Sequence, residues 1–194
     1  MIFLIFLPFT VNALDGTNSN SANILFVNGT CQCPNATVGD NDVINGVTYT
    51  AVDNSTIAGQ VANGNINLCT TLVTNMSSLF RDNLSFNSDI RFWDTVAVND
   101  MSGMFRDATT FNGDISNWNT SAVTNMEGMF RDAAAFNQYL RGWCVTNISS
   151  EPSNFATGSS ALTSSNKPLW GNCNQVINNG LLRLEELELR GKRY

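Results

Sequence analysis

Apolar residues recur at a fixed interval along the middle of the chain. The sequence Met76-Ser-Ser-Leu-Phe-Arg-Asp returns in closely similar form at Met101 and at Met126, so the period is 25 residues. Later positions repeat in the same register, as phenylalanines, aliphatic residues and tryptophans: Phe86, Phe111 and Phe136; Ile90, Ile115 and Leu140; Trp93, Trp118 and Trp143. Degenerate units contribute Leu68 and Val73 before this region and Phe155 after it. Such a period predicts that neighbouring units cover each other's apolar faces.

Each unit divides into two halves with different spacing. Met101, Met104, Phe105 and Ala108 stand at i, i+3, i+4 and i+7, which predicts a short helix capped by Asp100. The half from 115 to 123 has the L-x-x-L-x-L spacing of strands in leucine-rich repeats. The predicted fold is therefore α/β: a leucine-rich-repeat-like right-handed solenoid, with a short parallel sheet on one face and short helices on the other. The methionines, phenylalanines and tryptophans are expected in its core, and no cofactor pocket is predicted.

The units at 101–125 and 126–150 resemble the repeats of BspA-like leucine-rich-repeat bacterial surface proteins. The shared pattern is MF-x-x-A-x-x-FN-x-DIS-x-W-x-T-x-x-V-T-N-M. The resemblance implies an exported, surface-associated repeat protein used for binding or adhesion. It carries over no catalytic residue, because none is established for that family.

The flanking segments differ from the repeats in composition. The apolar run at 2–9, followed by Val11-Asn12-Ala13, predicts a signal peptide over residues 1–13 and hence a secreted or cell-surface protein. No transmembrane segment is expected after its removal. Residues 14–67 are expected to form an N-terminal cap with a β-hairpin at Asn45-Gly46. The repeats are assigned to residues 68–162, a C-terminal cap to 163–174 and a charged tail to 175–194.

The five cysteines fit an oxidising compartment better than a metal site. None stands in a CxxC pair, and the chain has no histidine to complete a zinc site. We predict a Cys144–Cys173 disulfide and pair Cys69 with either Cys31 or Cys33, which leaves one cysteine over. No metal site is predicted.

Charge and composition narrow the function further. The net charge is −6 and the pI about 4.4, which argues against a nucleic-acid partner. The absence of histidine removes the commonest general base, so no enzyme activity and no cofactor are predicted. Each repeat carries an Arg-Asp pair, at 81–82, 106–107 and 131–132. We interpret these pairs as neighbouring columns of opposite charge rather than as a binding site.

The surface of the predicted sheet is the remaining candidate for a functional site. In an L-x-L strand the intervening side chains point to the concave face, and this predicts a small polar ligand site: Asp94, Asn117, Asn119, Ser121 and Thr146. The sequence thus indicates a binding or adhesion module for an extracellular protein or glycan. A structural envelope or matrix component is the alternative, and a secreted hydrolase a further one.

Overall fold

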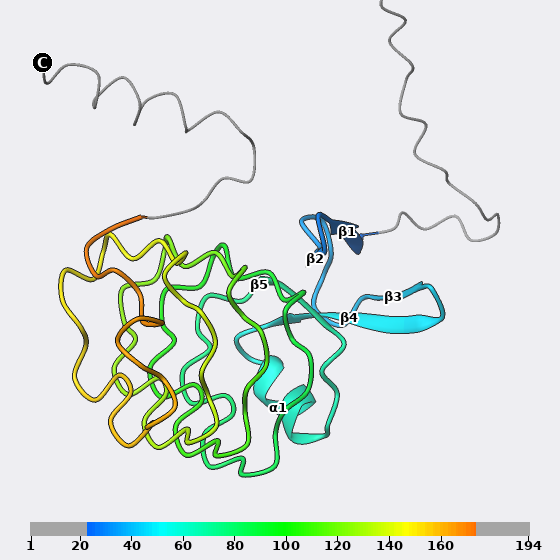
Figure 1. Cartoon of the computed structure of the whole chain (residues 1–194). Coiled ribbons are helices and arrows are strands. Elements are labelled where there is room, and N and C mark those ends of the chain that lie inside the picture. The colour runs from blue at the N-terminus through cyan, green and yellow to red at the C-terminus, as the bar shows by residue number, and fades with distance from the viewer. Residues whose placement is uncertain (1–22, 174–194) are drawn as a thin grey trace, which may run out of the picture.

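The computed structural model describes residues 23–173, so the predicted signal peptide (1–13) and the predicted charged tail (175–194) lie outside the described residues. Regular secondary structure is confined to the N-terminal part of this range (Figure 1). It comprises β1 (Leu25–Val27), β2 (Thr30–Gln32), β3 (Asn41–Ile44), β4 (Val47–Asp53), α1 (Ile57–Ala62) and β5 (Leu68–Leu72).

The predicted hairpin is present. Strands β3 and β4 pair antiparallel, with Ile44 opposite Val47. The two residues of the turn, Asn45 and Gly46, have φ values of 52° and 79°, which asparagine and glycine tolerate best. Strand β4 then pairs in parallel with β5, and α1 makes the connection between them.

The predicted fold class is wrong. In the repeats from Val73 to Cys173 the chain forms turns, bends and isolated bridges, with no α-helix and no β-strand. The only α-helix of the described residues is the six-residue α1, and the sheets are small and open. Residues 23–173 form no leucine-rich-repeat-like solenoid with a sheet on one face and helices on the other.

Consecutive tight turns replace each predicted helix. The N–H of Met104 donates to the carbonyl of Met101, and the N–H of Ala108 to that of Phe105, each closing a four-residue turn. The third residue of each turn, Gly103 and then Asp107, has a φ of +59°. A right-handed helix does not permit that conformation. The apolar stripe that predicted a helix is nevertheless buried, because two turns in sequence also bring these side chains to one side.

Successive units lie side by side, joined by hydrogen bonds between residues 24 to 26 apart (Figure 1). Along the turn segment every second N–H donates to a carbonyl of the next unit. Examples are Gly103 to Glu127, Phe105 to Met129 and Asp107 to Arg131, at 2.8 to 2.9 Å. The units therefore keep one register through the middle of the chain.

Aromatic side chains fill the space between the units. The ring of Phe105 lies 5.4 Å from that of Phe80 and 5.6 Å from that of Phe130, with interplanar angles of 2° and 7°. It also stacks on Phe111 of its own unit at 4.0 Å. The tryptophan N–H groups reach back one unit, as in the 3.3 Å bond from Trp118 to the carbonyl of Ile90. The core positions expected from the repeat are thus buried.

The register changes by one residue after the third unit. The turn closed by the Phe155 N–H and the Pro152 carbonyl has its positive-φ residue at Asn154, which is 26 positions after Gly128. As a result, Phe155 meets Phe130 edge-on, at 84°, instead of continuing the parallel row. The parallel row of rings ends here.

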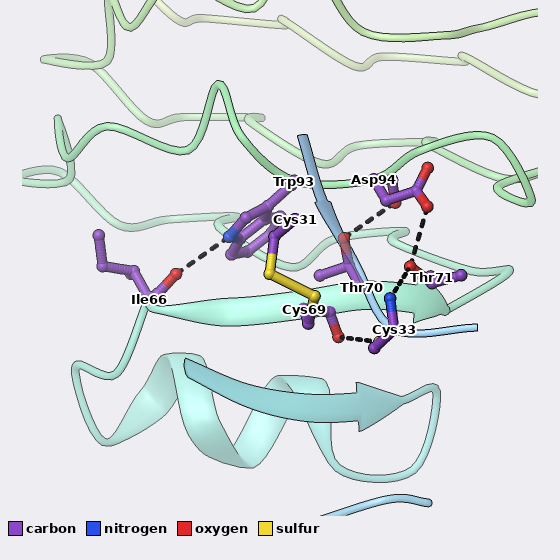
Figure 2. The surroundings of a disulfide bond; sticks show 8 residues. All are labelled: Cys31, Cys33, Ile66, Cys69, Thr70, Thr71, Trp93 and Asp94. Atoms are coloured by element: carbon purple, nitrogen blue, oxygen red, sulfur yellow. Dashed lines mark hydrogen bonds between the residues drawn. A yellow bond between two sulfur atoms is a disulfide. The ribbon is translucent and has the colours of Figure 1, made fainter. Parts of the chain in front are cut away.

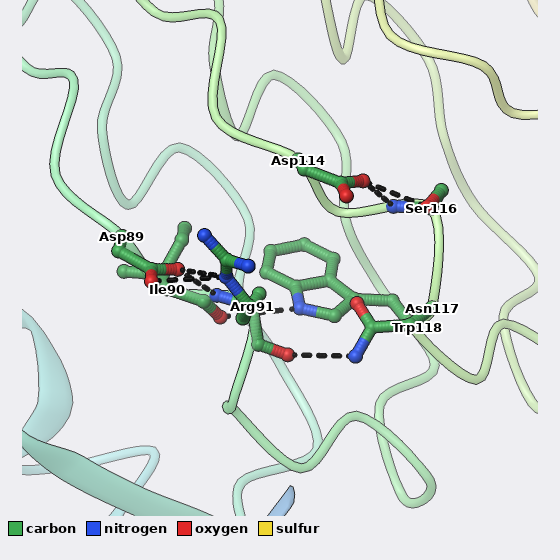
Figure 3. A network of polar contacts seen from close by, with 7 residues as sticks. All are labelled: Asp89, Ile90, Arg91, Asp114, Ser116, Asn117 and Trp118. Carbon is green, nitrogen blue, oxygen red and sulfur yellow. Dashed lines mark hydrogen bonds and ion pairs between the residues drawn. The ribbon is translucent and has the colours of Figure 1, made fainter. Parts of the chain in front are cut away.

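Asparagine and aspartate side chains hold many of the turns. Asp114, Asn119 and Asn125 each accept a hydrogen bond from the backbone N–H two residues later. Figure 3 shows the Asp114 turn, in which the hydroxyl of Ser116 also donates to the carboxylate. These short polar side chains replace water as partners of the turn backbone. The 28 asparagines of the chain are explained in part by this role.

Two disulfides fasten the ends of the repeat region. Cys144 and Cys173, the pair predicted from the sequence, are joined, and Cys31 is joined to Cys69 of β5. Cys33 is the free cysteine of the described residues, with its thiol 3.6 Å from the carbonyl oxygen of Cys69 (Figure 2). Burial raises the pKa of this thiol, so the reactive thiolate form is disfavoured.

Candidate functional site

The residues predicted to bind a ligand occupy one row of turns, not a concave sheet. Asn117, Ser121 and Thr146 are exposed, whereas Asn119 is half-buried and accepts hydrogen bonds from the N–H and hydroxyl of Ser121. Asp94 is buried, and its carboxylate accepts hydrogen bonds from the Thr71 hydroxyl (2.9 Å, Figure 2) and the Val96 N–H. The sequence argument for this site assumed strands, which are absent here.

The repeats form an open groove on the turn segments that replace the predicted helices. It has a volume of about 270 Å³ and crosses the turn segments of three consecutive units, reaching Asn154 in the next. Its lining is polar, with three arginines at equivalent positions and only one acidic side chain: Ser78, Arg81, Ser102, Gly103, Arg106, Asn125, Glu127, Gly128, Arg131 and Asn154. The groove therefore follows the direction in which the units repeat.

Each of the three arginines pairs with the aspartate that follows it. The distance from Nε to the Asp Oδ2 atom is 3.5 Å in the first unit and 3.2 Å in the second and third. Both partners are partly exposed, so each pair contributes little to stability. The aspartates are not part of the groove lining, whereas the arginines are.

Small residues with positive φ keep the groove open. Gly103 and Gly128 both have a φ of +59° and line it, and Ser78 and Asn154 take the same backbone conformation at its two ends. A Cβ at Gly128 would meet only one atom within 4 Å, the Cβ of Arg131, and Gly128 itself is buried. Space above this glycine is thus available to a ligand.

A second polar network lies elsewhere on the repeats (Figure 3). Arg91 pairs with Asp89 at 2.9 Å, and hydrogen bonding to Asp89 raises the pKa of the Arg91 guanidinium. Donation by the Ser116 hydroxyl and N–H lowers the pKa of Asp114. Asn117 donates to the carbonyl of Arg91 at 3.1 Å. All these groups are engaged with neighbours in the chain, and the bond from Asn117 to Arg91 joins two units.

Within residues 23–173, no three Cys, Asp or Glu side chains converge as a metal ion would require. No helix in that range is long and apolar enough to cross a membrane.

The repeats match a known protein family. Residues 51–167, more than half of the chain, match the family model described as "Mycoplasma protein of unknown function, DUF285". The chain belongs to the DUF285 family. No curated protein and no solved structure matches it. The matched range covers the end of β4, then α1, β5 and the repeats as far as residue 167, and thus the whole of the arginine-lined groove.

Sequence reasoning found the three arginines but interpreted them as part of a charge ladder. Their pairing with aspartate agrees with that interpretation, yet the same side chains also line the polar groove. The sequence signal that indicates the groove is the glycine two positions after Met101 and Met126. A glycine within an apparent helix indicates a backbone that a helix does not provide.

Proposed function

We propose that this DUF285 chain is an exported, non-catalytic binding module that holds an extended polar ligand across the arginine-lined groove. The observation that carries the proposal is the groove itself, because it repeats the same donor side chain in three consecutive units and is open along its length. A binding surface that repeats with the units suits a ligand that also repeats or is extended.

Other features support the same proposal. The 25-residue units resemble those of BspA-like bacterial surface proteins, the N-terminal segment has the pattern of a signal peptide, and disulfides belong to oxidising compartments. The ligand classes proposed are extracellular proteins and glycans. The groove has a modest size, so we expect moderate affinity for one chain and stronger retention when several chains act together.

The test uses the full chain after export, on an array of glycans and extracellular proteins. Arg106→Ala removes the central arginine of the groove, and Arg91→Ala is the matched control, because it removes an Arg-Asp pair outside the groove. We expect at least one ligand that the wild type and the control both retain and that the groove variant loses. An array without any ligand, or ligands retained equally by all three proteins, would contradict the proposal.

A structural envelope component is the second candidate, and one observation favours it. Strand β3 is the edge of its sheet, and Val43 on it is 63% exposed, a surface on which a second strand can pair. Sedimentation of the purified chain over a range of concentrations distinguishes the two. Assembly into fibres without a ligand supports the structural role, and a monomer at all concentrations contradicts it.

A further inference from the structure

Three of the five cysteines of the chain lie together in the N-terminal part of the fold. Cys31, Cys33 and Cys69 are all 0% exposed and belong to one small buried cluster with Ile24 and Ala51. Cys31 is joined to Cys69, and the thiol of Cys33 lies 3.6 Å from the carbonyl oxygen of Cys69 (Figure 2). A free thiol and a disulfide therefore share one buried site.

The thiol of Cys33 has no other cysteine of the chain left to pair with. The remaining two, Cys144 and Cys173, are joined to each other at the far end of the repeats. Because Cys33 is fully buried, a disulfide to a second chain would require this part of the fold to open widely. Exchange with the neighbouring disulfide needs neither a second chain nor an oxidant.

Cys31 and Cys33 are placed alike with respect to Cys69. Cys31 lies in β2, and Cys33 is the second residue after it, so in an extended segment their side chains face the same side. The Cys33 N–H donates to the Thr71 hydroxyl oxygen at 3.0 Å, which keeps this segment beside β5. The separations from Cys69 are 38 and 36 residues, so the entropy of loop closure favours neither pairing.

We propose that these three cysteines form a thiol–disulfide exchange site, which moves the crosslink from β2 to the residue after its end. The Cys33 thiol loses its proton to water, and the thiolate attacks Sγ of Cys69. The bond from Cys31 to Cys69 breaks as the bond from Cys33 to Cys69 forms, and Cys31 leaves as a thiolate that takes up a proton. One disulfide replaces another, so nothing is oxidised or reduced overall. Attack on Cys31 instead would join residues two apart in a strained ring.

The two pairings attach the N-terminal hairpin differently. Because Cys31 is part of β2, its disulfide fixes the β1–β2 hairpin directly to β5. After the exchange the hairpin depends on noncovalent contacts. These include the 2.8 Å bond from the Cys31 N–H to the Phe92 carbonyl and the ring of Phe26, 5.0 Å from that of Tyr49. The exchange therefore loosens a hairpin that carries a partly exposed aromatic side chain.

The exchange is expected to be slow. Burial raises the pKa of the Cys33 thiol, which keeps the thiolate scarce while the cluster is closed. The reaction therefore proceeds through transient opening of this part of the fold, over about minutes to hours. The two pairings are thus long-lived enough to be trapped and identified separately.

The first test identifies the free cysteine in the full wild-type chain. The oxidised protein is kept at about pH 8.5, near the ordinary pKa of a thiol, and sampled over a day. Each sample is unfolded in acidic guanidinium chloride with N-ethylmaleimide, then reduced and treated with iodoacetamide. Fragment ions of the peptide that holds both Cys31 and Cys33 show which one carries the maleimide. We expect maleimide on both residues, in a ratio that becomes constant, whereas maleimide on Cys33 alone at every time overturns the proposal.

Two serine variants of the full chain test the pairing itself. Cys31→Ser removes the present partner of Cys69, and we expect a Cys33–Cys69 disulfide with no free thiol. Cys33→Ser is the matched control, which should keep the Cys31–Cys69 bond and show no exchange. Cys31→Ala repeats the first variant without placing a hydroxyl in the buried cluster. Free thiols at both Cys33 and Cys69 in the two Cys31 variants would show that Cys33 cannot take the place of Cys31.

Hydrogen exchange of backbone amides tests the loosening of the hairpin. The amide of residue 31 should be protected at least about tenfold less in Cys31→Ser than in Cys33→Ser, because a disulfide no longer opposes local opening. The Ala51 amide, which donates to the Asp40 carbonyl at 2.8 Å, should be protected equally in both. Equal protection of residue 31 in the two variants would contradict a change in how the hairpin is attached.

Discussion

Replacing Thr120 by valine isolates one buried hydrogen bond between units. The Thr120 hydroxyl donates to the carbonyl of Cys144 in the next unit at 2.9 Å, and both residues are buried. That carbonyl receives no other hydrogen bond from the described residues. Valine has nearly the shape of threonine, so packing is kept, and the carbonyl is left without a partner away from water. The expected cost is about 1–3 kcal/mol of unfolding free energy.

The change is measured by urea unfolding with the disulfides intact, at pH 7. With a slope of about 1–3 kcal/mol per molar urea, the midpoint should fall by about 1 M while the slope stays constant. Thr146→Val is the control, because Thr146 is exposed and should change stability by less than about 0.5 kcal/mol. If the two variants unfold at the same urea concentration, the buried Thr120 hydrogen bond does not join the units energetically.

Further outcomes follow from the core, the second disulfide and the turns. Phe105→Ala removes a fully buried ring that contacts rings of three units and should cost about 3–5 kcal/mol, read from the same urea curves. Loss of the Cys144–Cys173 bond in the double serine variant opens a loop of 29-residue separation and should cost about 3–4 kcal/mol; an unchanged melting temperature would contradict the role given to this bond. Asp114 has a lowered pKa in the folded chain, so it stabilises the fold above its unfolded pKa of about 3.9 and loses that effect as pH falls through the folded value. The unfolding free energy of the Asp114→Asn variant should therefore fall less steeply than that of the wild type as the pH is lowered. Parallel plots of unfolding free energy against pH for the two proteins would refute this.

The sequence predicts the interior of the repeats better than their backbone. The 25-residue period placed Phe105, Phe111 and Trp118 in one apolar column, and all three are buried. This succeeds because burial depends on which residues recur together, whatever backbone carries them. The Asn45-Gly46 turn was also predictable, since few other residue pairs take positive φ at both positions.

The backbone of the repeats was mispredicted for a definite reason. Apolar spacing at i, i+3, i+4 and i+7 fits a helix, but two successive tight turns satisfy it equally. Gly103, and Asp107 four residues later, distinguish the two because both adopt positive φ. Without the helices and strands, the predicted concave face had no basis, and the arginine-lined groove arises from turns whose course no periodicity rule describes.

The contacts between units also bear on how such a gene can change. In the middle of the chain, neighbouring units are linked by backbone hydrogen bonds at equivalent positions, 24 to 26 residues apart. Each unit carries both the donors for the unit on one side and the acceptors for the unit on the other. An in-frame duplication of the second unit would therefore create an additional unit that fits on both sides without any new substitution. It would also lengthen the row of arginines by one. Unequal recombination between neighbouring copies can in this way change the number of units, while the disulfide-fastened ends are inherited unaltered.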